Sequence, residues 1–178
     1  MNNVAAPPWN SSGLLPPIDP ELPASTYRSP YPMSLKDVVI RFSTSPERRA
    51  VLQDFLGYRG ELHRMGIEDC IQWIDGSFLK NVETIEHRAP RDLDVVSFFN
   101  TTNDSNISEE VIKLFDQAVA KYRFSIDAYF VELNQDSPRE LSVLSAYWLS
   151  MRAHRRTQAW KGFLQVELAP TEDPEALT

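Results

Sequence analysis

The chain has 178 residues, of which 42% are hydrophobic and 11% aromatic, as is typical of a globular domain large enough to bury a core. The formal net charge of −7 argues against a protein that binds long nucleic acid through a broadly basic surface. No apolar run reaches the ~20 residues of a membrane span, and the polar start lacks a signal-peptide core, so we expect a cytoplasmic location. The single cysteine, Cys70, excludes an internal disulfide.

The start of the chain is rich in proline. Residues 1–33 hold eight of the thirteen prolines, which favour extended backbone and remove hydrogen-bond donors. We expect this arm either to be loose or to lie across the domain, with Leu14, Leu15 and Ile18 as anchors. Residues 34–168 are predicted to form the domain, and residues 169–178 a flexible tail.

Helix signals follow the arm. Ser45 before Pro46 and Glu47 predicts a helix that ends near Gly66. The segment 35–42 fits a short helix or an extended lead-in equally well. Two further helices are predicted, one opening at Ser108 and one at the capping box of residues 137–140. Their expected core-facing positions are Val111, Phe115, Ala118 and Tyr122 in the first, and Leu141, Leu144, Trp148 and Met151 in the second.

Apolar and alternating segments predict the strands. They run from Cys70 to the Gly-Ser turn at 76–77, over 92–99, over 124–131 and over 162–168. With the helices between them, they indicate an α/β (α+β) fold: a twisted mixed sheet of about four or five strands, backed by helices on one face.

Three aspartates in these strands are candidate ligands. Asp92 and Asp94 are two residues apart, so their side chains leave the strand on the same face and suit a divalent cation. Asp127 lies within the third strand, where a charge is costly to bury unless it is paired or coordinated. The Gly76-Ser77 turn offers backbone N–H groups and a hydroxyl to an anionic phosphate chain.

This arrangement resembles the nucleotidyltransferase superfamily that includes DNA polymerase beta. A wider set of motifs, spread over residues 14–168, looks like one small bacterial family of such domains. The motifs are Leu15-Pro16-Pro17, Ser29-Pro30-Tyr31, Arg41-Phe42-x-x-Ser45, Asp75-Gly76-Ser77-Phe78, Pro90-Arg91-Asp92-Leu93-Asp94-Val95-Val96 and Lys161-Gly162. The resemblance implies a minimal nucleotidyltransferase fold, with a first helix after Ser77 that is short or distorted here.

The resemblance also implies a set of site residues. Asp92 and Asp94 would hold two Mg²⁺ or Mn²⁺ ions about 3.5–4 Å apart, and Asp127 would complete the metal site on the acceptor side. The residues expected to bind the phosphates of the nucleoside triphosphate are Gly76, Ser77, Arg152 and Lys161.

The implied function is transfer of a nucleoside monophosphate from an NTP, with ATP preferred, to a hydroxyl of a protein, an RNA end or a nucleotide. Small stand-alone domains of this kind resemble parts of bacterial toxin–antitoxin or phage-defence modules, which implies a partner protein encoded nearby. The alternative is a non-catalytic nucleotide-binding or antitoxin-like interaction module. Three clustered aspartates count against that alternative, because like charges are costly to gather without a ligand.

Simpler interpretations of the same residues stay open. Asp127 could form a structural ion pair with an arginine, and Glu132 would take its place if the strand register differed. The basic residues near Arg152 could serve the dipole of their own helix. The Asp92-x-Asp94 spacing also occurs in two other acidic pairs, Asp19/Glu21 and Asp173/Glu175.

Overall fold

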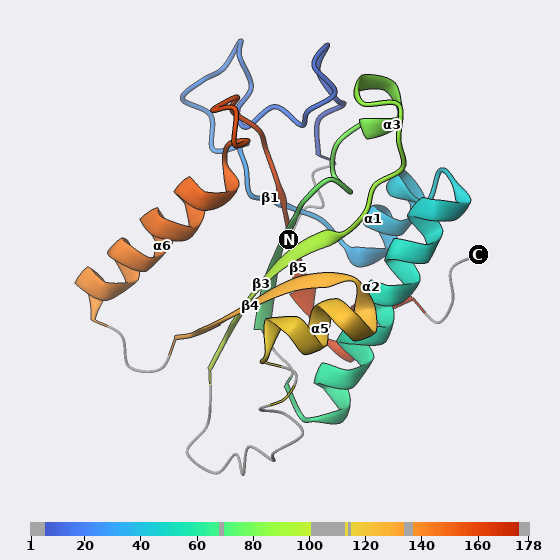
Figure 1. Ribbon diagram of the computed structural model, residues 1–178. Helices are drawn as coiled ribbons and strands as arrows, with labels where there is room; N and C mark the ends of the chain where they lie inside the picture. Colours follow the sequence, from blue (N-terminus) through green and yellow to red (C-terminus); the bar gives the residue numbers. More distant parts are fainter. Residues whose placement is uncertain (1–5, 68–69, 101–112, 114, 134–136, 175–178) are drawn as a thin grey trace.

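The computed structural model describes residues 6–67, 70–100, 113, 115–133 and 137–174. In this part of the chain, five strands form one mixed sheet in the order β1-β5-β2-β3-β4 (Figure 1). The strands are β1 (Tyr31–Pro32), β2 (Cys70–Asp75), β3 (Leu93–Phe99), β4 (Ile126–Glu132) and β5 (Leu164–Leu168). The predicted α+β fold with a mixed sheet backed by helices is therefore confirmed.

The strand pairing fixes which residues are neighbours across the sheet. β2 runs antiparallel to both β3 and β5, whereas β3 is parallel to β4, and β1 is parallel to β5. Asp75 is the register partner of Asp94, and Asp94 is in turn the partner of Asp127. Three carboxylates therefore lie side by side on three adjacent strands.

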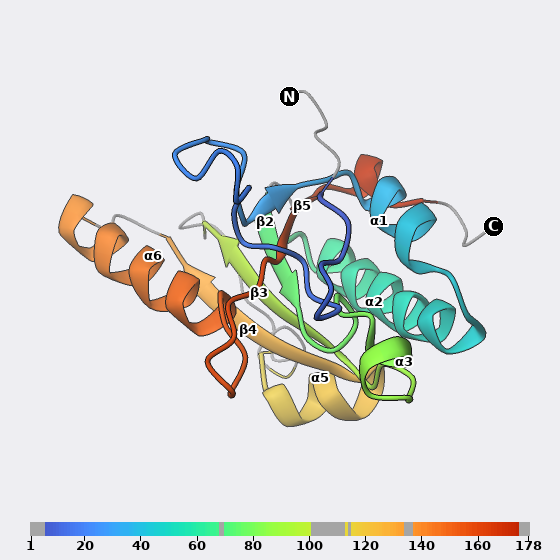
Figure 2. The same ribbon diagram turned by 90° about the horizontal axis from the view of Figure 1, so that it is seen from above.

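Helices cover both faces of the sheet, not one face as expected (Figures 1 and 2). α1 (Leu35–Phe42), α2 (Pro46–Arg64) and α5 (Gln117–Phe124) pack on the face that carries the main core. α6 (Pro138–Arg152) lies against the opposite face, where Trp148 packs on Val96 and Val131. Alternation along each strand explains the two cores, because successive side chains point to opposite faces.

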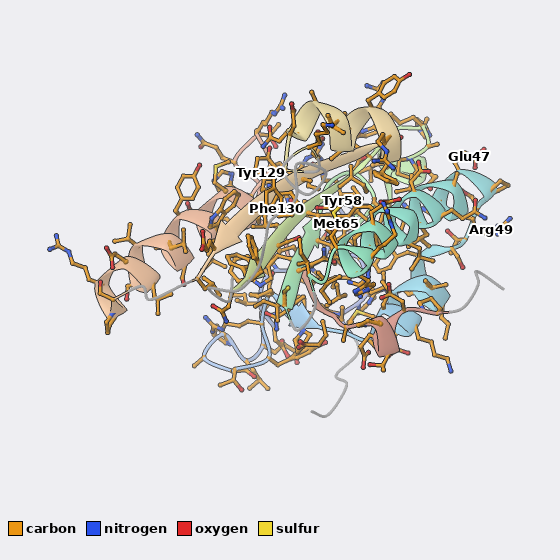
Figure 3. The ribbon with its side chains drawn as sticks, turned by 90° about the horizontal axis from the view of Figure 1, so that it is seen from below. Glu47, Arg49, Tyr58, Met65, Tyr129 and Phe130 are labelled. Carbon is orange, nitrogen blue, oxygen red and sulfur yellow. The ribbon has the colours of Figure 1, made fainter. Side chains whose placement is uncertain are left out.

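The start of α2 is as predicted. The Ser45 hydroxyl accepts a hydrogen bond from the Arg48 N–H, and Pro46 occupies the first turn. Tyr58 of α2 packs near Phe130 of β4, with ring centroids 6.5 Å apart, while Glu47 and Arg49 lie at the outer end of the helix (Figure 3). The helix thus spans the sheet with one face buried.

The other helices agree with the sequence only in part. Residues 35–42 form a helix capped by Ser34, and the capping box that opens α6 is confirmed. The predicted start at Ser108 lies outside the described residues, and α5 begins after Asp116. Tyr122 is 92% exposed, so its predicted place in the core is wrong. The stripe on α6 is also only half correct, because Leu141 and Met151 are exposed.

The arm lies across the domain. Leu14 and Leu15 are buried, whereas Ile18 is exposed, so two of the three expected anchors serve that purpose. The Gly162 N–H donates to the Leu15 carbonyl at 2.6 Å, and a Cβ at Gly162 would come within 2.7 Å of the Pro16 carbonyl oxygen. Close approach of the two backbones explains why glycine follows Lys161.

The segment after β5 is also attached to the domain. Residues Pro170–Glu172 form a single 3₁₀ turn, and the Asp173 carboxylate accepts hydrogen bonds from the buried guanidinium of Arg59. His63 contacts the same carboxylate at 3.1 Å. No helix in the described ranges is long and apolar enough to cross a membrane.

Candidate active site

A row of carboxylates crosses one end of the sheet. Asp75 ends β2, while Asp94 and Asp127 lie near the starts of β3 and β4 in direct register. Asp92 precedes Asp94 by two residues, the spacing that places side chains on one face of a strand. All four line a pocket of about 660 Å³. Like charges placed directly opposite one another destabilise a sheet, so this row needs compensation.

The turn after β2 lies against the start of β3. Gly76 has φ of 95°, and a Cβ there would approach the Asp94 nitrogen to 3.0 Å and the Asp92 carbonyl to 3.2 Å. Only glycine fits this position without strain. The Ser77 hydroxyl accepts the Arg91 N–H at 3.1 Å and donates to Asp92 Oδ1 at 3.4 Å. The turn and the Asp92-x-Asp94 motif therefore form one structural unit.

A buried arginine holds the loop that follows the turn. Arg48 of α2 is 1% exposed and donates to the carbonyls of Phe78 and Lys80 at 2.7 and 2.6 Å. It also binds both oxygens of Glu83, on the four-residue helix α3 (Val82–Ile85). The short α3 agrees with the reduced first helix expected after Ser77. Lys80 reaches the pocket from this loop, and burial and the charge of Lys161 lower its pKa.

Arg152 places a guanidinium beside the carboxylates. It is the last residue of α6, and its Nη1 lies 3.3 Å from Asp94 Oδ2. Its Cζ lies 4.7 Å from the centre of the Tyr129 ring. This cation–π contact helps to hold the guanidinium group in place. The side chain is 7% exposed, yet Nε and Nη2 have no hydrogen-bond partner. The guanidinium of this pocket-lining residue therefore has two unsatisfied donors.

Lys161 is engaged inside the site. Its ammonium donates to Asp75 Oδ2 and to the Arg152 carbonyl, the latter at 2.8 Å, and both charged side chains of the ion pair are 6% exposed. The bond to Asp75 leaves Asp75 Oδ1 buried without a partner. Lys161 thus joins the end of α6 to the end of β2. The structure brings both predicted phosphate-binding cations, Arg152 and Lys161, into the pocket of the aspartates.

The carboxylates differ in their electrostatic surroundings. Burial raises the pKa of Asp94 to about 6, the Asp75 carboxylate adds to the shift, and the Arg152 guanidinium opposes it. Burial also acts on Asp92, but the hydrogen bond and charge of Lys121 outweigh it and hold the pKa of Asp92 below its usual value. The row therefore contains one carboxyl that resists ionisation and one that is firmly ionised.

Lys121 of α5 lies between two members of the row. Its Nζ is 2.6 Å from Asp92 Oδ2 and 2.8 Å from Asp127 Oδ2. The alternative of an ion pair for Asp127 is thus present in the structure, with a lysine in place of the expected arginine. Within the part of the chain that the structure describes, no three Asp, Glu, His or Cys side chains form a ready-made metal site.

The competing residues from the sequence lie elsewhere. Glu132 is at the opposite end of β4, where it pairs with Phe99, whereas Asp127 pairs with Asp94, so the fallback to Glu132 is not needed. Asp19 accepts the backbone N–H of Glu21, and Asp173 binds Arg59. Those acids have structural partners that do not belong to the pocket.

Three charged residues of the pocket region were not predicted as site residues from the sequence, namely Asp75, Lys80 and Lys121. Asp75 had a signal, because it directly precedes the Gly-Ser turn and ends a strand. Lys80 lies three residues after Ser77, and no sequence pattern marked it as a site residue. Lys121 reaches the site because Ser125 adopts φ of 55° and turns the chain from α5 directly into β4.

The fold and pocket define an α+β protein with a charged site at one end of a mixed sheet. The chain belongs to the family of unknown function DUF6932, whose model matches residues 7–167. No curated protein and no solved structure matches the chain. Family membership assigns no activity, so the resemblance to nucleotidyltransferases stays a prediction from the sequence.

Proposed function

We propose that this protein is a metal-dependent nucleotidyltransferase that moves a nucleoside monophosphate from an NTP, preferably ATP, to an acceptor hydroxyl. The observation that carries the proposal is the register of Asp94 with Asp127, beside the Gly76–Ser77 turn that contacts Asp92. Carboxylates for a metal ion, beside a turn that can offer backbone N–H groups to phosphates, are what a metal-bound triphosphate requires.

The residue types of the row fit Mg²⁺ or Mn²⁺. All candidate ligands are carboxylate oxygens, which these hard ions prefer, and the buried Asp75 Oδ1 has no partner. Asp92, Asp94 and Asp127 would hold the ions, with Asp75 beside them. Bound Mg²⁺ would activate the acceptor hydroxyl and neutralise charge on the triphosphate.

The pocket lining also contains cations that suit phosphates. Five cationic side chains line the pocket together with the four aspartates: Lys80, Arg152, Arg155, Arg156 and Lys161. Arg152 brings two free buried donors, and guanidinium groups bind phosphate oxygens through paired N–H groups. The pocket lining thus carries both signs of charge, as a metal–nucleotide does.

The chain's own residues have separable tasks in such a reaction. The acceptor oxygen would form a bond to the α-phosphorus while the bond to the β-phosphate oxygen breaks, releasing pyrophosphate and the hydroxyl proton. Asp127 faces the acceptor side in this assignment, whereas Gly76, Ser77 and Arg152 orient the phosphates. Catalysis of this kind depends on positioning and charge, so rigid supports such as the Arg48 contacts matter.

The acceptor we favour is compact: a protein hydroxyl, an RNA end or a second nucleotide. The net charge of −7 disfavours a long nucleic acid. A regulatory role in a bacterial toxin–antitoxin or phage-defence module, with a partner protein encoded nearby, is part of the proposal.

A second candidate is a nucleotide-binding module without turnover. One observation favours it: the Lys121 ammonium contacts both Asp92 and Asp127, so an ion-pair network can account for the position of those two carboxylates. An inactive module would bind nucleotide in the same pocket through Arg152 and the Gly76–Ser77 turn.

Incubation with each α-labelled NTP and Mg²⁺, alone and with cell extract, separates the two candidates. We expect label in protein, RNA or a small product, and loss of that label in Asp94→Ala but not in Glu167→Gln, an exposed acid of β5. NTP binding without incorporation under any condition would favour the inactive module, and label in long templated DNA would refute the compact acceptor.

A further inference from the structure

Lys121 is the cation nearest to the predicted metal ligands. Its ammonium contacts the Oδ2 atoms of Asp92 and Asp127 at 2.6 and 2.8 Å, one carboxylate on each side. An ammonium bridging two carboxylates occupies the position that a divalent cation would share between them.

The helix that carries Lys121 is fixed at both ends. Asp116 caps the start of α5 by accepting the Ala118 N–H at 2.8 Å, and the left-handed Ser125 closes its end with a hydrogen bond to the Lys121 carbonyl. α5 packs on β4 and on α2. The backbone of Lys121 is therefore held beside the site, while its side chain is 41% exposed.

The ion pairs of Lys121 lie in a partly solvated position. The side chains of Lys121, Asp127 and Asp92 are 41%, 37% and 28% exposed, and ion pairs in such positions contribute modest net free energy. The arrangement differs from that of Lys161, whose ion pair with Asp75 is almost completely buried. Lys121 can thus leave the carboxylates at modest cost, whereas Lys161 cannot.

We propose that Lys121 is a resident counter-ion of the active site, which holds Asp92 and Asp127 together in the metal-free protein and is displaced when the metal binds. This inference rests on the proposed function, because it assumes that these carboxylates bind a metal. Lys121 and the metal ion then compete for the same carboxylates. The favourable free energy of metal binding is reduced by the cost of moving the Lys121 ammonium away from Asp92 and Asp127.

The test is a titration of the purified full-length chain with Mn²⁺, followed by electron paramagnetic resonance of the free ion. Lys121→Met keeps the length and the apolar part of the side chain but removes the charge. We expect Mn²⁺ to bind Lys121→Met at least fivefold more tightly than the unmodified protein. Lys36→Met, at an exposed lysine of α1, is the matched control and should not change the affinity.

A second measurement uses thermal unfolding in EDTA. Without Lys121 the carboxylates repel one another, so Lys121→Met should unfold at a lower temperature than Lys36→Met and should gain more from added Mn²⁺. This readout does not depend on transfer activity.

The possible outcomes separate the inference from the proposed function. Equal Mn²⁺ affinity of Lys121→Met and the unmodified protein, or weaker binding by the variant, would overturn the counter-ion role and leave the metal site standing. Absence of Mn²⁺ binding in both proteins would overturn the metal site and the counter-ion role together. Tighter binding in the variant supports both.

Discussion

Asp75 and Asp94 are direct partners in the antiparallel pairing of β2 with β3, and both carboxylates line the same pocket. Each has its own cation, since Lys161 binds Asp75 and Arg152 lies 3.3 Å from Asp94. The compensation is unequal, because burial and the Asp75 charge still raise the pKa of Asp94 to about 6. Ionisation of Asp94 therefore destabilises the metal-free fold.

The first prediction concerns pH in EDTA. The pKa of Asp94 is raised from 3.8 to about 6 in the folded chain. As the pH rises, the unfolded chain therefore loses this proton before the folded chain does, and the free energy of unfolding falls between about pH 4 and 6. Asp94→Asn should raise the unfolding free energy at pH 7.5 by about 1–2 kcal/mol, below the full equivalent of the shift because a quarter of the side chain is exposed. Chemical denaturation at several pH values measures it.

At pH 4 the same substitution should have almost no effect, because Asp94 is then largely protonated in the fold. Glu167→Gln serves as the control, since Glu167 is an exposed acid on the same sheet. A stabilisation by Asp94→Asn of equal size at both pH values would show that packing, not charge, is responsible.

The second prediction concerns the metal. Mg²⁺ or Mn²⁺ should raise the unfolding temperature, by about 5 °C or more at saturating concentrations, and NTP should increase the rise further. Asp94→Ala should stay folded and lose this rise, because a central ligand is missing. Differential scanning fluorimetry with and without EDTA is sufficient, and an unchanged rise in the variant would remove Asp94 from the metal site.

A third prediction compares two glycines. Gly76→Ala forces a side chain into a residue with φ of 95° and against the Asp94 backbone, so it should destabilise the protein by about 1–3 kcal/mol and weaken nucleotide binding. Gly60→Ala in α2 meets nothing within 4 Å and should stabilise by about 0.5–1 kcal/mol. Urea denaturation compares them, and equal effects would contradict the steric role of Gly76.

Local sequence patterns predicted much of the fold. The Ser45 cap, the capping box before α6 and the strand at the Asp92-x-Asp94 motif are encoded within a few adjacent residues, and all three appear in the structure, although β3 begins at Leu93 and leaves Asp92 just outside it. The resemblance implied that Asp127 shares a site with Asp92 and Asp94, and the register of β3 with β4 places Asp127 beside Asp94.

Contacts between residues far apart in the chain could not be predicted from the sequence. Lys121 reaches Asp92 across 29 residues, and nothing in the composition of α5 indicates which of its side chains turns toward the sheet. Helical periodicity likewise could not tell that Tyr122 is solvent-exposed, because an apolar stripe does not reveal how much of it another element covers. The packing of α6 against the second face of the sheet likewise depends on long-range contacts that the local sequence does not reveal.

The fourth prediction divides binding from chemistry. Asp127→Asn should keep nucleotide affinity within about twofold and abolish label transfer, because Asp127 is assigned to the acceptor side. Ser77→Ala should instead weaken nucleotide binding about tenfold, since it loosens the turn against Asp92. Calorimetry and the label assay are run on both variants. Equal loss of nucleotide affinity in both variants would refute the division of roles.

The last prediction concerns Arg152, whose Nε and Nη2 are buried without partners. Lysine keeps the charge but lacks the planar fork, so Arg152→Lys should weaken NTP binding about tenfold. Binding of the nucleoside, which has no phosphates, should be unaffected. Arg49→Lys is the control, because Arg49 lies at the outer end of α2, away from Tyr129 (Figure 3). Equal weakening of nucleoside and NTP binding would indicate that Arg152 supports the pocket through Tyr129 and Trp148 and does not bind phosphate.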